Sequence, residues 1–242
     1  MRVTDNIYVL SGSYYSAVND SDFLGEVYGV YTPEGLILID CGIPVRGLEI
    51  IRENLAYYGI TDKITHLIIT HAHWDHCGCA AAIQAMGAKV IVGAEDKIYC
   101  TNGGVRGLDP RSPFDDTHVF DALTPDILIE KDCEMLLGGL AFAFIKTPGH
   151  TPGSIMIKVN IDGKTAVFTG DALQPDGKSI VSEVEFGWQG DIGFCRENIV
   201  KSMVKLMDHE TDMVLPGHGK ICLRNGTQVL RLAAQNAFLT LR

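Results

Sequence analysis

Short apolar runs bounded by turn residues recur along the chain and predict a series of strands. In length and composition they match buried or half-buried strands, which are short and end at Gly, Pro, Asn or Asp. The expected strands cover residues 7–10, 27–31, 36–40, 66–70, 89–92, 133–137, 140–146, 154–159, 165–169 and 213–215, with one more near residue 127. Apolar residues at helical spacing predict helices over residues 45–58, 76–86, 194–207 and 226–239.

The order of these elements predicts a layered α/β protein. Helices interrupt the strands in both halves of the chain, although the two halves share no repeated sequence. Two sheets packed face to face, with helices on their outer faces, accommodate such an order. We therefore expect an α/β (α+β) fold, a four-layer αββα sandwich, formed by one domain over residues 1–242.

The turn after the expected strand at 66–70 concentrates potential metal ligands. His71, His73, Asp75 and His76 follow that strand within six residues. A single His more often packs in a core or caps a helix, but four such residues in one turn favour a metal site. Imidazole suits Zn, Fe, Co and Ni, and a carboxylate adds the negative charge that helps to hold a divalent ion.

Three further potential ligands also follow expected strands. His150 lies in a Pro- and Gly-rich turn after the strand at 140–146, Asp171 comes just after the run at 165–169, and His218 follows a third strand. Because α/β folds build their sites at the carboxyl ends of strands, we expect all seven side chains to meet at one rim.

This ligand pattern resembles that of the metallo-β-lactamase superfamily, whose signature is H-x-H-x-D-H followed by a separate His, Asp and His. The resemblance, within the superfamily to a glyoxalase II or lactonase-like branch, extends from about Ile7 to His218. It implies the αββα fold and two metal ions per chain, with ligands divided as follows: His71, His73 and His150 on the first; Asp75, His76 and His218 on the second; and Asp171 bridging both.

The resemblance also implies a supporting role for Asp40, which ends the run at 36–40. The matching aspartate in the family holds a ligand imidazole in one tautomer. The alternative is that Asp40 caps the turn before Gly42.

Two bound divalent ions, most simply Zn²⁺ with Fe or Mn as alternatives, account for a hydrolase mechanism. They can share a bridging hydroxide, because metal binding lowers the pKa of water from about 15.7 toward about 7. Asp75 is the expected catalytic residue: it would accept a hydrogen bond from the hydroxide and pass a proton to the leaving group. Ser154 and Cys77 lack a free base, so we interpret Ser154 as a turn residue and Cys77 as a packed helix residue.

Composition narrows the possible partners and location. The chain has 242 residues, 46% of them hydrophobic, and a net charge of −10 without a basic stripe, which disfavours a nucleic-acid partner. It has no apolar run of membrane-spanning length and no apolar signal core at its start. Seven Cys without paired spacing favour free thiols in a reducing cytosol. We expect a cytoplasmic protein with a small-molecule substrate and no membrane partner; the sequence leaves the oligomeric state undetermined.

Two long irregular stretches, residues 100–126 and 174–193, adjoin the ligand segments and are typical of lids or binding loops. Phe186 and Trp188 offer apolar surfaces of the kind that line small-molecule pockets, or else pack their loop against the core. His118, in the first stretch, is expected mainly at the surface.

Differences between this sequence and known branches of the superfamily narrow the set of possible reactions. Glyoxalase-II-like thioesterases add a carboxyl-terminal glutathione domain, for which the 24 residues after His218 leave no room. Acyl-homoserine lactonases carry a tyrosine three residues after the bridging Asp, where this chain has Gln174. We expect a hydrolase of a small ester, lactone or thioester. A mononuclear iron enzyme similar to persulfide dioxygenases, or a non-catalytic ligand-binding sensor, are the alternatives.

Overall fold

Two β-sheets form the centre of the protein in the computed structural model, which describes residues 1–12, 24–105, 108, 118–176, 183–190 and 193–241. Within these residues, the first sheet has the strand order β1-β2-β3-β4-β5-β6 and the second has the order β13-β10-β9-β8-β7. The strands of the first sheet are β1 (Ile7–Ser11), β2 (Val27–Thr32), β3 (Gly35–Ile39), β4 (Ile64–Ile68), β5 (Lys89–Gly93) and β6 (Ile127–Ile129). Those of the second are β7 (Cys133–Leu137), β8 (Leu140–Lys146), β9 (Ile155–Ile161), β10 (Lys164–Gly170) and β13 (Met213–Pro216). A short separate pair consists of β11 (Gln174–Pro175) and β12 (Val184–Glu185).

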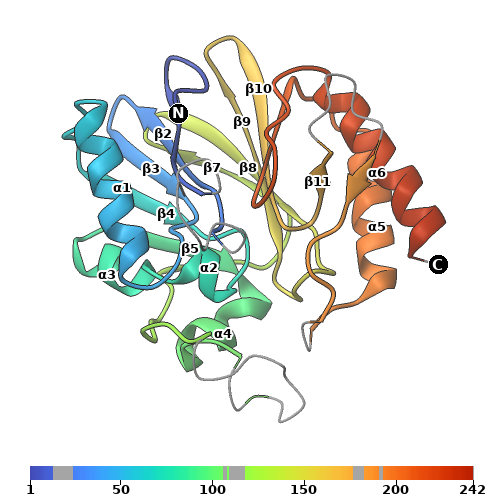
Figure 1. Ribbon diagram of the computed structural model, residues 1–242, viewed down its shortest axis with the longest axis horizontal. Coiled ribbons are helices and arrows are strands. Elements are labelled where there is room, and N and C mark those ends of the chain that lie inside the picture. Colours follow the sequence, from blue (N-terminus) through green and yellow to red (C-terminus); the bar gives the residue numbers. More distant parts are fainter. Residues whose placement is uncertain (13–23, 106–107, 109–117, 177–182, 191–192, 242) are drawn as a thin grey trace.

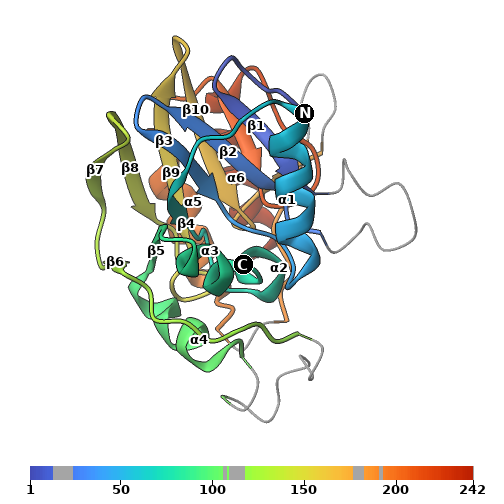
Figure 2. The same cartoon turned by 90° about the vertical axis from the view of Figure 1, so that its left-hand side faces the viewer.

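Helices cover the outer faces of both sheets, which confirms the expected four layers (Figure 1, Figure 2). α1 and α3 lie against the first sheet, and α5 and α6 against the second. The described helices are α1 (Arg46–Tyr57), α2 (Trp74–Cys77), α3 (Ala80–Ala85), α4 (Lys97–Asn102), α5 (Arg196–Leu206) and α6 (Gly226–Thr240), with a 3₁₀ turn, η2, at Ala94–Asp96. None of them is long and apolar enough to cross a lipid bilayer.

Three buried clusters hold the layers together. β3 shows how the sequence builds them, because all five of its residues are buried and successive side chains point to opposite faces. Leu36 and Leu38 face the cluster beneath α1 and α3, whereas Ile37 and Ile39 face the cluster between the sheets. The third cluster packs α5 and α6 on the second sheet.

The prediction of one helix over residues 76–86 is wrong, because the chain breaks there into α2 and α3. Gly78 lies so close to the loop before α1 that a Cβ on it would be 2.4 Å from the Pro44 nitrogen. Cys79 then accepts a hydrogen bond from the Leu48 backbone at 3.1 Å. The two stretches expected to be irregular also contain the end of α4 and the β11–β12 pair.

The strand directions bring chain segments together at one rim. β3, β4 and β5 are parallel neighbours, and so are β10 and β13 in the other sheet. The backbone nitrogen of Ile155, at the start of β9, donates to the Thr70 oxygen beyond β4 at 2.9 Å and ties the two sheets together there. The ligand-type side chains all follow strands that end at this rim.

Candidate metal centre

Three histidines form a compact triangle of nitrogens. His71 and His73 come from the turn after β4, and His150 comes from the loop between β8 and β9; all three are buried. Nε2 of His71, Nδ1 of His73 and Nε2 of His150 lie 3.1–3.2 Å apart in every pair. Each neutral imidazole nitrogen is a donor or an acceptor, so three of them cannot all pair with one another. A shared cation fits this arrangement, since tetrahedral zinc bonds of about 2.0–2.1 Å separate ligands by about 3.3–3.4 Å.

A second triangle lies beside the first and is more open. The Asp75 Oδ2 atom is 2.9 Å from Nε2 of His218 and 3.5 Å from Nε2 of His76, and the two imidazole nitrogens are 3.1 Å apart. The side chain of His76 is fully buried, but those of Asp75 and His218 are 14% and 19% exposed. Solvent therefore reaches the centre from the side of Asp75 and His218.

Asp171 stands between the two triangles, just after β10. Its Oδ2 atom is 3.7 Å from Nε2 of His150 and 3.6 Å from Nε2 of His218, and its Oδ1 atom is 3.4 Å from Nε2 of His76. Oδ1 is buried and accepts no hydrogen bond from the described residues. A buried carboxylate oxygen without a hydrogen-bond donor is suited to bind a cation, and the place of Asp171 between the triangles would let it bridge two.

Asp40 fixes the orientation of ligand-type rings from behind. Its Oδ1 accepts the Thr70 backbone N–H at 2.7 Å, and its Oδ2 lies 2.9 Å from Nδ1 of His76. The Thr70 hydroxyl donates to Asp40 Oδ2 at 2.7 Å, so its oxygen can accept from Nδ1 of His71 at 3.1 Å. Both imidazoles thereby turn Nε2 toward the triangles, as second-sphere partners of metal ligands do. The side chain does not cap the turn before Gly42, the alternative interpretation.

The two triangles differ in charge in the metal-free protein. Burial opposes protonation of His76, but the carboxylates of Asp75, Asp171 and Asp40 outweigh it and raise its pKa to about 10. Burial also opposes ionisation of Asp75, yet the nearby His76 and His218 hold the pKa of this carboxyl well below its usual range. In the first triangle, burial and the neighbouring imidazoles lower the pKa of His71 well below its ordinary value. Near neutral pH, His76 in the second triangle therefore carries a proton, whereas His71 in the first does not.

Two glycines that the sequence patterns did not single out let the backbone approach the centre. A Cβ on Gly217 would lie 2.3 Å from Asp171 Oδ1 and 2.8 Å from His76 Cε1. A Cβ on Gly187 would lie 2.7 Å from the Asp171 Cβ and 3.1 Å from His150 Cε1. The only signal in the sequence is that Gly217 adjoins His218.

The proposed pocket residues flank Gly187 and have different environments. Phe186 is half-buried and packs against the cluster beneath α5 and α6, whereas Trp188 is 47% exposed. On the ligand turn, Trp74 makes an edge contact with the half-buried His118, with ring centroids 5.1 Å apart.

The two side chains that we set aside as nucleophiles have structural contacts. Cys77 is fully buried in the cluster beneath α1 and α3. Ser154 is buried, and its hydroxyl oxygen accepts a hydrogen bond from the Thr151 backbone at 3.0 Å.

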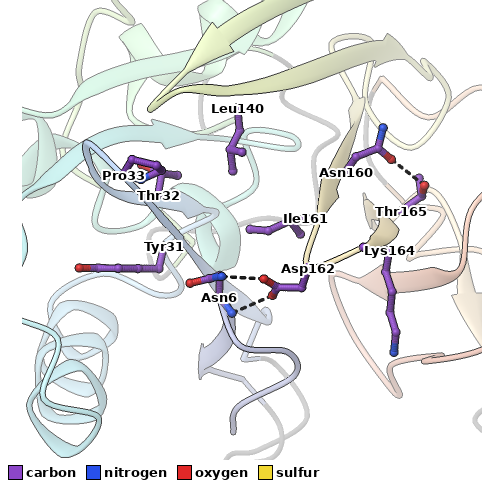
Figure 3. Close-up of a pocket in the computed structure, with 11 residues that line it drawn as sticks. Asn6, Tyr31, Thr32, Pro33, Leu140, Asn160, Ile161, Asp162, Lys164 and Thr165 are labelled. Carbon is purple, nitrogen blue, oxygen red and sulfur yellow. Dashed lines mark hydrogen bonds between the residues drawn. The ribbon is translucent and has the colours of Figure 1, made fainter.

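A groove of about 610 Å³ lies away from this centre, beside the β9–β10 turn (Figure 3). Asp162 in that turn accepts hydrogen bonds from the backbone and side chain of Asn6 at 2.9 and 2.6 Å. Lys164 at the start of β10 lines the groove, while Asp171 follows the opposite end of the same strand. The groove is therefore not the entrance to the metal centre.

Comparisons with known proteins agree with this geometry. YflN of Bacillus subtilis, a probable metallo-hydrolase, is 28% identical over 205 residues, 77% of this chain and 76% of YflN. Hydroxyacylglutathione hydrolase GloC of Haemophilus influenzae is 30% identical over 156 residues, 63% of this chain and 68% of GloC. The crystal structure of BJP-1, a subclass B3 metallo-beta-lactamase of Bradyrhizobium japonicum, has a TM-score of 0.73 at 22% identity and covers 97% of this chain and 89% of BJP-1. Residues 22–218 match the sequence model of the metallo-beta-lactamase superfamily, and the chain therefore belongs to that superfamily of metal-binding proteins.

Proposed function

We propose that this protein is a dinuclear metal hydrolase, with zinc as its metal, that acts on a small ester, lactone or thioester. The observation that carries the proposal is the pair of ligand triangles with Asp171 between them. A single ion in the first triangle would leave the converging side chains of Asp75, His76 and His218 without a cation to bind. Imidazole-rich sites with carboxylates suit zinc, although iron and manganese accept similar ligands.

Bound ions would supply a water whose pKa falls toward about 7 and would polarise the scissile carbonyl. Asp75 provides the acid–base function of the chain itself. It stays ionised because of its neighbours, and it lies at the open side of the centre. From there it would orient the attacking water by accepting a hydrogen bond, take up the proton of that water as its oxygen bonds to the carbonyl carbon, and pass the same proton to the leaving group.

The relative GloC supports an acyl bond in the substrate. The alignment covers a slightly larger share of GloC than of this chain, so that hydroxyacylglutathione hydrolase is no longer than this protein. The 24 residues after His218 therefore do not argue against a thioester substrate, which stays within the expected class. Gln174 still occupies the position of the lactonase tyrosine, and it belongs to β11. Within the proposed class, thioesters and simple esters are favoured over lactones.

The proposal is tested by counting metals and measuring turnover on the same zinc-reconstituted sample. The panel contains thioesters, carboxylic esters, lactones, β-lactams and phosphodiesters. We expect two ions per chain and multiple turnovers of one acyl class. One tightly bound ion with zinc in excess would contradict the dinuclear centre. Oxygen consumption with a persulfide by an iron-loaded sample would favour the oxygenase, and ligand binding without turnover would favour the sensor.

The second metal position is expected to fill in a pH-dependent way. His76 carries a proton below its metal-free pKa of about 10, so a cation at the second triangle must displace that proton. The pKa of His218 in this triangle is raised as well, so the apparent zinc affinity of the triangle should rise at least about tenfold per pH unit as the pH approaches 10. His71 needs no such displacement near neutrality, so the first triangle should fill at lower pH. Metal content in zinc buffers at pH 6, 7 and 8 should move from one ion toward two; equal filling of both positions at every pH would contradict this expectation.

Trp188→Ala is expected to raise KM about tenfold for substrates with apolar groups and to leave the metal content unchanged. The half-exposed indole lies one residue beyond Gly187, which touches the ligand cluster, and an aromatic contact worth about 1.4 kcal/mol corresponds to a tenfold effect. Steady-state kinetics with a series of acyl chain lengths measures it. Tyr57→Ala, at an 81% exposed position on α1, is the control. A KM unchanged across the series would remove Trp188 from the pocket.

A further inference from the structure

The ligand turn after β4 is flanked by buried aspartates on both sides. In the first sheet β4 lies between β3 and β5. Asp40 follows β3, and Asp96 ends the 3₁₀ turn after β5. The contacts of Asp40 reach His76 directly and His71 through Thr70. Asp96 has a separate set of partners.

Asp96 joins the two segments that supply the first triangle. Its Oδ2 accepts the Ala72 backbone N–H at 2.9 Å and the Thr151 hydroxyl at 2.7 Å, and its Oδ1 accepts the Gly153 N–H at 2.7 Å. Ala72 lies between His71 and His73, and Thr151 directly follows His150. The Asp96 carboxylate thus connects the two chain segments that carry the three histidines of the first triangle.

The surroundings of Asp96 leave little room for these segments to shift. The side chain is fully buried, and its three donors offset the cost of burying a carboxylate. A Cβ on Gly153 would lie 2.4 Å from the Asp96 nitrogen, and one on Gly93 would lie 1.8 Å from the Gly153 oxygen. The loop that presents His150 is therefore pressed directly against the end of β5.

We propose that Asp96 is a positioning residue for the first metal site, and that it sets the spacing of the His71, His73 and His150 nitrogens by holding their two segments in register. This inference rests on the proposed metal centre. Without the carboxylate, the Ala72 and Thr151 segments lose their shared acceptor and the 3.1–3.2 Å triangle is free to widen. Loss of such support around metal ligands weakens metal binding by about 10–100-fold.

The test separates the two sites by using single-site backgrounds and Co²⁺ as the probe. His218→Ala leaves the first triangle intact, and His73→Ala leaves the second. Asp96→Asn is added to each, and Co²⁺ affinity is measured by chelator competition together with the visible spectrum of the bound ion. We expect a 10–100-fold weaker affinity and an altered spectrum in the His218→Ala background. In the His73→Ala background we expect a change of less than about twofold, since the donors to Asp96 are Ala72, Thr151 and Gly153, none of which belongs to the second triangle, and that triangle takes no ligand from the His150 loop.

Two further variants keep the test decisive. Asp126→Asn is the control for lost stability, because Asp126 also accepts a backbone N–H, that of Val90 at 3.0 Å, but lies outside the ligand loops. It should lower the Tm without changing either affinity. Thr151→Val removes one of the three donors to Asp96 and should give a smaller loss at the first site only.

Equal weakening of both sites by Asp96→Asn, or no change at the first site with either Asp96→Asn or Thr151→Val, would overturn the positioning role. Failure of the unsubstituted protein to bind Co²⁺ would overturn the metal centre itself, and with it this inference. If the two single-site backgrounds bind Co²⁺ and adding Asp96→Asn changes neither the affinity nor the spectrum, the inference alone would be overturned. The two failures are therefore distinguishable.

Discussion

Asp75→Asn is expected to lower kcat by about 10²–10⁴-fold while the protein remains folded, the usual contribution of a positioned acid–base group. An amide occupies the same space as the carboxylate, but it cannot take up and release the proton. The contacts of Asp75 Oδ2 with His218 and His76 hold the native group ionised, so the substitution removes the charge at the open side of the centre. The measurement is kcat together with metal content and a circular dichroism spectrum for each sample.

A matched variant separates the loss of this carboxylate from a general change in charge. Asp121 is exposed and outside the ligand set, so Asp121→Asn should retain full kcat. An Asp75→Asn sample that keeps two ions and full turnover would refute the acid–base role. If turnover falls only in proportion to a lost ion, Asp75 acts as a ligand alone.

The fold was predictable because strand lengths and helix periods are local properties. Residues 133–137 and 140–146 were predicted as strands with the bounds that β7 and β8 have. The break between α2 and α3 was not, since it depends on Pro44, more than thirty residues away, packing against Gly78. A helical pattern in the sequence records the apolar face but not an approach from another segment.

The ligand-type residues were predictable for a related reason. Each follows a strand, and strand ends at one rim place short side chains together without further information. Asp96 also follows a strand, β5, but its role depends on partners far away in the chain: Ala72, Thr151 and Gly153 lie 24 to 57 positions from it. Its role can be recognised only from the structure, in which both ligand loops donate hydrogen bonds to the Asp96 carboxylate.

The sequence could not separate the two aromatic residues of the β12 segment. Phe186 and Trp188 share the same residue class and the same loop. In the structure, Phe186 is half-buried against the cluster beneath α5 and α6, and Trp188 is left exposed. Phe186 therefore packs the segment against the core, whereas about half of Trp188 is exposed.

Removing the metals is expected to abolish turnover and to lower the Tm by about 15–30 °C. Each ion present at about 1,000 times its Kd stabilises the folded chain by about 4 kcal/mol, and about 1 kcal/mol shifts the Tm of a protein of this size by about 2–4 °C. The metal-free centre also gathers the carboxylates of Asp40, Asp75 and Asp171, which protonated His76 compensates only in part. Scanning calorimetry with and without a chelator measures the shift, and added Zn²⁺ should restore both properties.

A variant with both triangles disrupted, His150→Ala combined with His218→Ala, serves as the reference for chelation. Its Tm should not respond to the chelator, because neither triangle retains all of its nitrogens. A chelated native protein with an unchanged Tm and continued turnover at metal contents far below one ion per chain would contradict a metal-dependent reaction. Loss of turnover with an unchanged Tm would instead mean that protonated His76 and its carboxylate partners stabilise the rim as much as the bound ions do.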